Sequence, residues 1–374
     1  MIFELQFLSS ETDARAGRLC LPHGELLTPV FMPVGTRATV KGIMNDALEE
    51  LASGIILSNA FHLYLRPGAD LIERAGGIHK FMNWKGNLLT DSGGYQVFSL
   101  SALRRISEEG VCFQSPLDGS YHTFTPERVM EIERQLGADI IMAFDECSPY
   151  PCDHDYARES LERTTRWAAR CRREFQDDAQ TLFGIVQGSI YPDLRLESAR
   201  QIIDIGFAGY AVGGLSVGES KSEMLPALAA AVSALPMDAP RYLMGVGLPE
   251  DIIKGVTRGI DMFDCVLPAR MGRNGTVFTM QGRLNIRNAV YAEDHRPIED
   301  GCPCAACQGY SRAYVRHLFK CGEMLAAILA TTHNLVFYKR LMQNIRRAIL
   351  EDAFSDYSAD FLGGYLGGPY GKQL

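Results

Sequence analysis

The sequence predicts an α/β fold, specifically a (β/α)8 TIM-type barrel with a metal-binding subdomain inserted after the last strand. Three observations support this prediction. Eight short apolar runs alternate with longer amphipathic segments. Nearly every run ends in a polar residue or a glycine, and no Gly-rich dinucleotide loop follows the first run, which disfavours an open doubly wound sheet. A cluster of cysteines follows the eighth run, where the regular alternation stops.

The eight apolar runs are the expected barrel strands. They are, in chain order, Val30–Val34, Ile55–Ser58, Leu88–Thr90, Ile140–Phe144, Leu182–Val186, Tyr210–Val212, Tyr242–Met244 and Met262–Cys265. Active sites of such barrels lie at the C-terminal ends of the strands. The residues at those ends are therefore expected to form the rim of one pocket: Asn59, Asp91, Asp145, Gln187, Gly213, Gly214, Gly245 and Asp264.

The helix expected at Pro126–Leu136 has the clearest boundary signals. Thr125 is a good N-cap residue, Pro126 suits the first helical position, and Gly137 suits the residue after the helix. Apolar residues at helical spacing mark the remaining helices between the strands. These are expected at Glu159–Arg173, Asp193–Ile205, Ser222–Leu235 and Pro249–Arg258.

Composition and termini bound the class of protein. Of 374 residues, 47% are hydrophobic and 22% are charged, as in ordinary globular proteins. No apolar run approaches the roughly 20 residues that cross a membrane, and the N-terminus lacks the basic region of a signal peptide. Most of the ten cysteines are scattered singly, which favours reduced thiols. The expected location is cytoplasmic, with no membrane partner.

The charge distribution leaves two interpretations open. A net charge of −8 argues against nonspecific coating of nucleic acid. Two basic groups nevertheless follow the last strand, and they mark either a solvated helix surface or a site for a polyanion. The first group is Arg270, Arg273, Arg283 and Arg287, and the second is Arg312, Arg316, Lys320, Lys339, Arg340, Arg346 and Arg347.

The cysteine cluster predicts a closed tetrahedral Zn²⁺ site with one ion per chain. Cys302, Cys304 and Cys307 supply three thiolates, and a histidine completes the set. His333 is preferred to His317, because it is expected at a helix start whereas His317 lies inside a continuous basic helix. Four protein ligands leave no position for a reacting water, so the ion is expected to be structural. The chain is thus expected to form one catalytic barrel over residues 1–374, with a zinc-binding subdomain at about 272–345 that contains small β structure over Gly272–Ile298.

Three of the strand ends carry an aspartate, which points to chemistry. Asp91, Asp145 and Asp264 each follow a separate strand, so they are expected to line one pocket. A single aspartate at such a place is as readily explained as a helix N-cap, but three together are not. The first is followed by Ser92-Gly93-Gly94-Tyr95-Gln96, where two glycines let the backbone approach a ligand and an aromatic ring can stack on it.

These segments resemble the bacterial tRNA-guanine transglycosylase family. The resemblance runs from about Phe7 to Ala353. It rests on Asp91–Gln96, Asp145-Glu146-Cys147, Ile185–Gly188, Gly213-Gly214-Leu215, Gly245-Val246-Gly247, Phe263–Pro268, Arg273-Asn274-Gly275 and the cysteine cluster. The family has a (β/α)8 barrel with a zinc-bearing insertion. The resemblance implies exchange of guanine at the anticodon wobble position of tRNA for 7-aminomethyl-7-deazaguanine, a queuosine precursor, and a homodimer.

The resemblance also implies roles for the pocket residues. Asp264 is expected to be the nucleophile at the ribose anomeric carbon, and Asp91 the general acid/base. Asp145 is expected to accept hydrogen bonds from the guanine ring N–H and amine. Ser92, Gly93 and Gly94 are also expected to bind the base, with Gln187 and the Gly214 backbone N–H near its carbonyl and Tyr95 and Met244 on its faces. Leu215 and Glu219 are expected to bind the aminomethyl group. Val34 and Cys147 are expected to exclude a bulkier base such as queuine.

The expected RNA contacts lie in two segments on either side of the last strand. They are Gly245, Val246, Gly247, Leu248, Pro249, Glu250 and Asp251 in the first, and Ala269, Arg270, Met271, Gly272 and Arg273 in the second. Ala269 and Met271 depart from the residues that related chains often carry, which affects fine specificity more than the reaction. The target nucleotide must be flipped out of the anticodon loop to reach the pocket.

Two alternatives remain beside the transglycosylase. One is a noncatalytic tRNA-binding subunit of the same fold, which would lack the full catalytic set that this chain keeps in Asp91, Asp145 and Asp264. The other is a glycoside hydrolase that releases guanine to water, which leaves the basic zinc region without a purpose. The Gly363–Pro369 tail is expected to be a flexible end with no assigned role.

Overall fold

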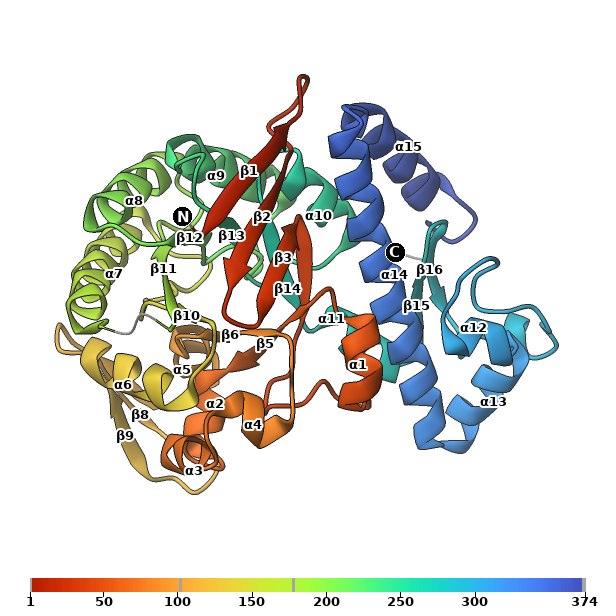
Figure 1. The fold of residues 1–374 in the computed structure, drawn as a ribbon, viewed down its shortest axis with the longest axis horizontal. Helices are drawn as coiled ribbons and strands as arrows, with labels where there is room; N and C mark the ends of the chain where they lie inside the picture. Colours follow the sequence, from red (N-terminus) through yellow and green to blue (C-terminus); the bar gives the residue numbers. More distant parts are fainter. Residues whose placement is uncertain (1, 101–102, 177–178, 372–374) are drawn as a thin grey trace.

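The computed structural model contains an eight-stranded parallel barrel at its centre (Figure 1). It describes residues 2–100, 103–176 and 179–371. The barrel strands, in chain order, are β4 (Val30–Pro33), β5 (Ile55–Asn59), β6 (Asn87–Asp91), β10 (Ile140–Met142), β11 (Thr181–Val186), β12 (Gly209–Val212), β13 (Arg241–Leu243) and β14 (Met262–Cys265). All eight predicted strands are present, and their bounds differ from the predicted ones by no more than two residues.

Neighbouring strands pair in chain order around the ring, and β14 returns to pair with β4. Between β4 and β5 the ring is closed only by a bridge from Val34 to Leu57, so the barrel is nearly closed. Its interior is filled by side chains such as Met32, Leu89 and Phe183. The barrel is therefore a packed core, and ligands have room only at its ends.

Helices alternate with the strands and cover the barrel. They are α1 (Asn45–Leu51), α2 (Ala60–Leu65), α3 (Ala69–Arg74), α4 (Ile78–Met82), α5 (Gly94–Leu100), α6 (Pro126–Leu136), α7 (His154–Glu174), α8 (Pro192–Ile205), α9 (Lys221–Ala234) and α10 (Pro249–Val256). The signals for α6 are confirmed: the Thr125 side chain accepts from the Arg128 N–H, and Gly137 is left-handed.

Two small antiparallel sheets were not predicted. The first, β1 (Phe3–Leu8), β2 (Arg15–Leu21) and β3 (Gly24–Thr28), covers the end of the barrel where the strands begin. Its Phe3, Leu19 and Leu26 side chains join the apolar cluster of the barrel interior and close that end. The second, β7 (Arg104–Ile106), β8 (Val111–Gln114) and β9 (Tyr121–Phe124), lies between α5 and α6 in the chain.

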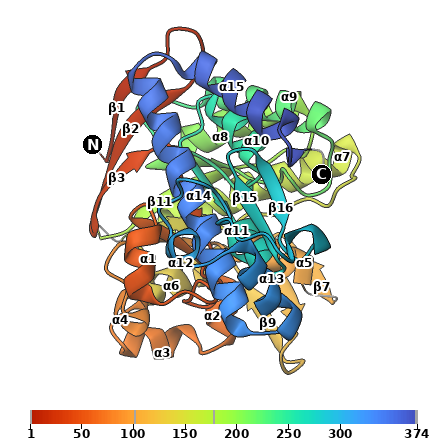
Figure 2. The same ribbon diagram turned by 90° about the vertical axis from the view of Figure 1, so that its right-hand side faces the viewer.

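The chain after β14 forms the segment with the cysteine cluster. It contains α11 (Leu267–Arg273), β15 (Thr276–Thr279), β16 (Gly282–Asn285), the short 3-10 helix η1 (Ala289–Tyr291), α12 (Ala305–Gly309) and α13 (Arg312–Cys321). The predicted small β structure is thus confirmed as the β15–β16 hairpin. The long helix α14 (Met324–Leu350) runs between this segment and the barrel and contacts both (Figures 1 and 2).

The prediction of a flexible C-terminal tail is wrong for most of its length. Gly363 to Gly367 form the end of helix α15 (Phe354–Gly367), which packs on α14. Phe354, Phe361 and Tyr365 are buried on its inner face, so tertiary packing stabilises a helix that its glycines alone would disfavour. In the part of the chain that the structure describes, no helix is long and apolar enough to span a lipid bilayer.

Candidate active site

A cavity of about 440 Å³ lies where the barrel strands end, and Asp91, Asp145 and Asp264 all line it. The three acids come from β6, the loop after β10 and β14. The structure therefore brings together the three carboxylates that the sequence placed at separate strand ends. Asp91 and Asp145 are almost completely buried, while Asp264 is partly accessible from the cavity.

Asp91 accepts three hydrogen bonds. Asn59 Nδ2 donates to Oδ2 at 2.5 Å, Gln96 Nε2 donates to the same oxygen at 2.8 Å, and the Ala60 backbone N–H donates to Oδ1 at 3.0 Å. Burial raises the pKa of Asp91 to about 6 despite these donors, and the nearby charge of Asp264 adds to the rise. A carboxyl with a pKa near neutrality can both give and take a proton, as a general acid/base must.

Asp264 has a different hydrogen-bonding pattern. Tyr242 Oη donates to Oδ1 at 2.5 Å, and the Gly245 backbone N–H donates to the same oxygen at 2.7 Å. Among the described residues, no group donates a hydrogen bond to Oδ2. Burial raises the pKa of Asp264, and the Tyr242 and Gly245 donors counteract part of that rise. One oxygen is thus fixed in place while the other is free to react.

Asp145 is held with one donor on each oxygen. Ser92 Oγ donates to Oδ1 at 2.9 Å and Gln187 Nε2 donates to Oδ2 at 2.7 Å. Burial raises the pKa of Asp145 to about 6. Each oxygen retains acceptor capacity, so the carboxylate can receive two parallel N–H groups of a planar base. Gly94 permits this arrangement, because a Cβ there would lie 2.6 Å from both the backbone oxygen and Oδ1 of Asp145.

Gln187 and Glu219 stand behind the cavity wall rather than in it. Gln187 is 1% exposed and donates to Asp145, and its Oε1 has no hydrogen-bond partner among the described residues. Glu219 accepts from the Ser216 and Val217 backbone N–H groups. The Ser216 N–H and the Leu215 carbonyl belong to one trans peptide and lie on its opposite sides. The hydrogen bond from Ser216 to Glu219 therefore points the Leu215 carbonyl away from Glu219.

The remaining residues predicted to bind the base form the cavity wall. Ser92, Gly93, Gly214 and Leu215 line it, as do Tyr95 and Met244, the two side chains predicted to stack on the base. Tyr95 is 53% exposed, so its ring is accessible to a ligand. Val34 and Cys147, the residues predicted to limit the size of the base, also line the cavity.

Sequence reasoning missed the residues that hold the acids and the loops in place. Tyr242 was identified only as part of a strand, although its hydroxyl contacts Asp264. Arg195 of α8 is fully buried and donates to the backbone oxygens of Val186, Gly213 and Gly214. It therefore ties the loops after β11 and β12 together. Neither residue belongs to a recognisable motif, and an arginine in an amphipathic helix resembles a surface residue.

The predicted RNA-binding segments lie beside the cavity mouth, but few of their side chains are free. Gly245 lines the cavity and Arg270 is exposed. Leu248, Glu250, Met271 and Arg273 are half-buried, while Val246, Gly247, Pro249, Asp251, Ala269 and Gly272 are buried. The charge of Asp251 is balanced by an ion pair with Lys221. Arg270 and Arg273 are the basic residues of the two segments.

Part of the second basic group is engaged within the fold. Arg312 is buried and donates to the Pro297 and Ile298 carbonyls, Arg340 pairs with Glu299, and Arg346 donates to the Gly17 and Thr28 carbonyls. These three side chains hold the fold together and are not available to a phosphate. Arg316 is half-buried and donates from Nε to the Asn288 carbonyl at 2.9 Å, while Lys320 is exposed on α13.

Cys302, Cys304, Cys307 and His333 converge as predicted, and all four are buried. The three sulfur atoms lie 3.7, 3.5 and 3.3 Å from His333 Nδ1, close to the roughly 3.6 Å expected between sulfur and nitrogen ligands of a tetrahedral zinc ion. His333 Nε2 is 2.7 Å from the Phe278 carbonyl, a partner that fixes the ring. The cluster is thus a metal site.

The choice of His333 was correct, but the reason given for it was wrong. His333 does not begin a helix, because it lies well inside α14. His317, the competing residue, is exposed on α13. Burial and the direction in which each helix faces therefore separate the two histidines, and neither is visible in the sequence.

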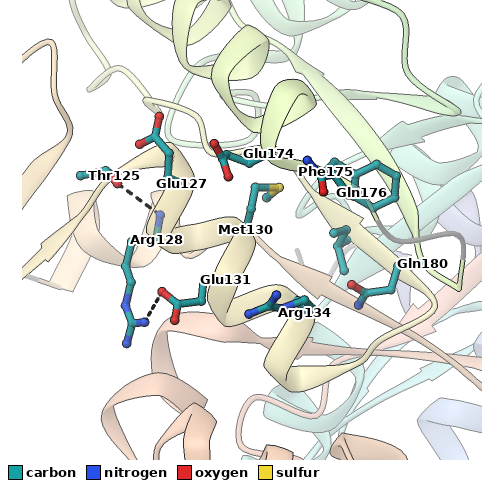
Figure 3. A pocket seen from close by; sticks show the side chains of 11 residues that line it. Thr125, Glu127, Arg128, Met130, Glu131, Arg134, Glu174, Phe175, Gln176 and Gln180 are labelled. Atoms are coloured by element: carbon teal, nitrogen blue, oxygen red, sulfur yellow. Dashed lines mark hydrogen bonds and ion pairs between the residues drawn. The ribbon is translucent and has the colours of Figure 1, made fainter.

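A second hollow lies outside the barrel, between α6 and the end of α7 (Figure 3). At about 770 Å³ it is larger than the acid-lined cavity. Three of its charged side chains are engaged in ion pairs, Arg128 with Glu131 and Glu127 with Arg170. None of the predicted site residues lines it. The acid-lined cavity is therefore the candidate active site.

The fold and the cavity define a (β/α)8-barrel enzyme with carboxylates at its C-terminal strand ends and a Cys3His metal site after the last strand. A family model described as queuine tRNA-ribosyltransferase matches residues 10–366. The chain belongs to this family. A queuine tRNA-ribosyltransferase of Desulforamulus reducens is 59% identical over 94% of this chain and 95% of that protein. One of Halothermothrix orenii is 57% identical over 97% and 98%, respectively.

Proposed function

We propose that this chain exchanges guanine at the wobble position of tRNA for 7-aminomethyl-7-deazaguanine, through a covalent ribose–Asp264 intermediate. The observation that carries the proposal is that acids in one cavity differ in their hydrogen-bond donors and in their pKa. Asp264 has both of its donors on Oδ1, which leaves Oδ2 as a nucleophile. Asp91 has a pKa of about 6, which suits proton transfer.

In the first half-reaction, Asp264 Oδ2 forms a bond to the ribose anomeric carbon while the bond from that carbon to guanine breaks. Asp91 gives its proton to the departing base. In the second half-reaction, Asp91 takes a proton from the incoming base, whose nitrogen attacks the same carbon and releases Asp264. Two displacements restore the original configuration, and Asp145 accepts the paired N–H groups of each base in turn.

The choice of incoming base rests on the cavity wall. Val34 and Cys147 both line the cavity, so their volume limits a substituent on the base. The Leu215 carbonyl, turned away from Glu219 by the Ser216 hydrogen bond, is an acceptor for an ammonium group. These features support a small aminomethyl substituent over the bulky ring of queuine.

The covalent step is tested by incubating the protein with wobble-guanine tRNA and separating the products on a denaturing gel. Wild type should form a protein–RNA adduct, and Asp264→Asn should form none while still binding tRNA. Asp193→Asn, which changes an exposed carboxylate on α8, is the matched control and should behave as wild type. An adduct of normal yield with Asp264→Asn would overturn the proposal.

The adduct gel and an incorporation assay together separate the alternatives. A noncatalytic subunit of the same fold binds tRNA without forming an adduct, even as wild type. A hydrolase releases guanine into solution and does not incorporate a labelled base into tRNA. Incorporation of labelled guanine into tRNA, with the aminomethyl base as competitor, is the outcome expected here.

The bound RNA is proposed to lie over the cavity mouth. In this proposal Arg270 and Arg273 contact the wobble region, and Lys320 and the remaining guanidinium nitrogens of Arg316 contact phosphates, which position RNA without specifying its sequence. Arg270→Ala should weaken tRNA binding and its dependence on salt. Unchanged salt dependence would remove Arg270 from the RNA surface.

We also propose that the Cys3His site holds one structural Zn²⁺ per chain, within a zinc-binding subdomain of about residues 272–345 in a single barrel domain. Three thiolates and one imidazole are a typical closed zinc donor set. Cys302, Cys304, Cys307 and His333 would hold the ion and fix α12 against α14. With all four positions filled by protein, such an ion supplies stability and no reacting water.

A homodimer is proposed, with an interface at the start of α13, where Tyr310 lies just before the helix and Tyr314 lies in its first turn. The Tyr310 and Tyr314 rings stack with centroids 5.4 Å apart, and both side chains are exposed. Such rings are typical of protein interfaces. Tyr314→Ala should raise the dimer dissociation constant in sedimentation experiments, whereas Tyr121→Ala, which removes an exposed ring on β9, should not. A dimer of normal affinity with Tyr314→Ala would contradict this interface.

A further inference from the structure

Three metal-ligating side chains lie together at the end of the barrel where the strands begin, opposite the acid-lined cavity. His23 lies in the turn between β2 and β3, His79 lies in α4, and Asp139 directly precedes β10. His23 Nδ1 is 2.7 Å from Asp139 Oδ1, and His79 Nε2 is 3.1 Å from Asp139 Oδ2. The two imidazole rings are stacked, with their centroids 3.8 Å apart.

We propose that His23, His79 and Asp139 form a second metal site, for a divalent first-row transition ion such as Zn²⁺ or Co²⁺. One ligand atom from each residue lies within 4.8 Å of the others. Metal–ligand distances of about 2.1 Å place tetrahedral neighbours about 3.4 Å apart. Because the two imidazoles are stacked nearly parallel, both rings must turn out of the stack to direct a nitrogen at one ion. Two imidazoles and one carboxylate match the borderline ions of this series better than Mg²⁺ or Ca²⁺.

The surroundings of Asp139 suit a metal ligand. Its side chain is 1% exposed, and the Leu88 backbone N–H donates to Oδ2 at 2.8 Å, which orients the carboxylate. Burial raises the pKa of Asp139, but hydrogen bonds from His79, His23 and Leu88 outweigh it and hold the pKa below its usual value. The carboxylate therefore stays ionised, as metal binding requires.

Access to the cluster is from one side. The His23 side chain is 39% exposed and that of His79 is 10% exposed. An ion can therefore enter beside His23, and water can complete its coordination. Binding places the imidazole lone pairs on the metal and moves the ring protons to the other nitrogens or to solvent.

Such an ion would join three segments that are distant in the sequence. It would connect the β2–β3 turn to α4 and to the start of β10, beside an existing bond from Asn87 Nδ2 to the Gly24 carbonyl at 3.2 Å. The β1–β3 sheet closes this end of the barrel, so the expected effect is on stability. This face of a barrel generally carries stability rather than catalysis.

The test uses the full chain with its Cys3His metal in place. After weakly held ions are removed on a chelating resin, Co²⁺ is titrated and followed by calorimetry and absorption. Wild type should bind one further equivalent, with weak d–d bands and no thiolate charge-transfer band. The ion should also raise the Tm, since it binds only the folded state.

His23→Gln and His79→Gln should each weaken this binding by more than about 100-fold, beyond the effect of losing an outer-sphere partner. Glutamine keeps an N–H donor for Asp139, so a purely structural hydrogen bond is largely preserved. His154→Gln removes another exposed histidine paired with an aspartate, Asp193, and should bind as wild type. No further equivalent in wild type, or one that persists in both cluster variants, would overturn the site.

Discussion

Removing the hydroxyl of Tyr242 should move the pH dependence of the first chemical step. Tyr242 is fully buried, and its Oη donates to Asp264 Oδ1 at 2.5 Å. In Tyr242→Phe only the Gly245 N–H remains on that oxygen. A hydrogen bond to a charged group is worth about 1.5–3 kcal/mol, and about 1.4 kcal/mol corresponds to one pKa unit. The pKa of Asp264 should therefore rise by about 1 to 2.

The sign of the effect follows from the role of Asp264. A nucleophile must be ionised, so adduct formation accelerates as pH rises through its pKa. In Tyr242→Phe that rise should occur about 1 to 2 pH units higher, which makes the variant about 10- to 100-fold slower at pH values below the wild-type pKa. Well above both pKa values the variant should be at least as fast, because its carboxylate is less stabilised.

The measurement is the rate of adduct formation in single turnovers across a pH series, with quenched samples resolved on denaturing gels. Tyr210→Phe is the matched control, because Tyr210 is a buried tyrosine on the neighbouring strand β12 and does not line the cavity. Its pH profile should equal that of wild type. An unshifted profile in Tyr242→Phe, or one shifted to lower pH, would refute the assignment of Asp264 as the ionised nucleophile.

Three further predictions concern the other acids and the metal. Asp145→Ala should lower kcat/KM for guanine by at least about 100-fold, since two hydrogen bonds to a charged group are lost. Its tRNA affinity in a filter-binding assay should stay nearly unchanged. A large loss of tRNA affinity would make Asp145 structural. Cys304→Ser should lose metal by elemental analysis and lower the Tm, and full metal content would contradict the site. As pH rises from about 4 to about 6, Asp91→Asn should become more stable relative to wild type, by up to about 3 kcal/mol of unfolding free energy. The reason is that burial raises the pKa of the Asp91 carboxyl to about 6, so wild type loses stability as this carboxyl ionises. Parallel urea-unfolding curves for the two proteins across that window would disprove it.

The barrel could be predicted because its strands have a local signature. Each is a short apolar run, nearly every run is followed by a polar residue or a glycine, and each run corresponds to an observed strand. The three acids could be predicted for the same reason, because parallel strands bring their C-terminal ends to one face. The metal ligands were predictable because three thiols at such close spacing are typical of a zinc site.

What escaped prediction depends on contacts between distant segments. The β1–β3 sheet is fixed by packing of Phe3 into the barrel end and by a buried ion pair between Arg15 and Asp261. Helix α15 forms because Phe361 and Tyr365 are buried, despite a glycine-rich sequence. Local propensity contains none of this information, since the stabilising contacts are made with segments far away in the chain.

The placement of hydrogen-bond donors, more than burial, distinguishes the three acids from one another. Burial raises the pKa of each, so burial alone gives them the same character. Asp264 has both donors on one oxygen, which frees the other to attack carbon. Asp145 has one donor on each oxygen, which leaves two parallel acceptor sites for a base. Those donors come from side chains and backbone at several strand ends. Substitutions of Tyr242 or Gln187 should therefore alter the roles of the acids without changing any carboxylate.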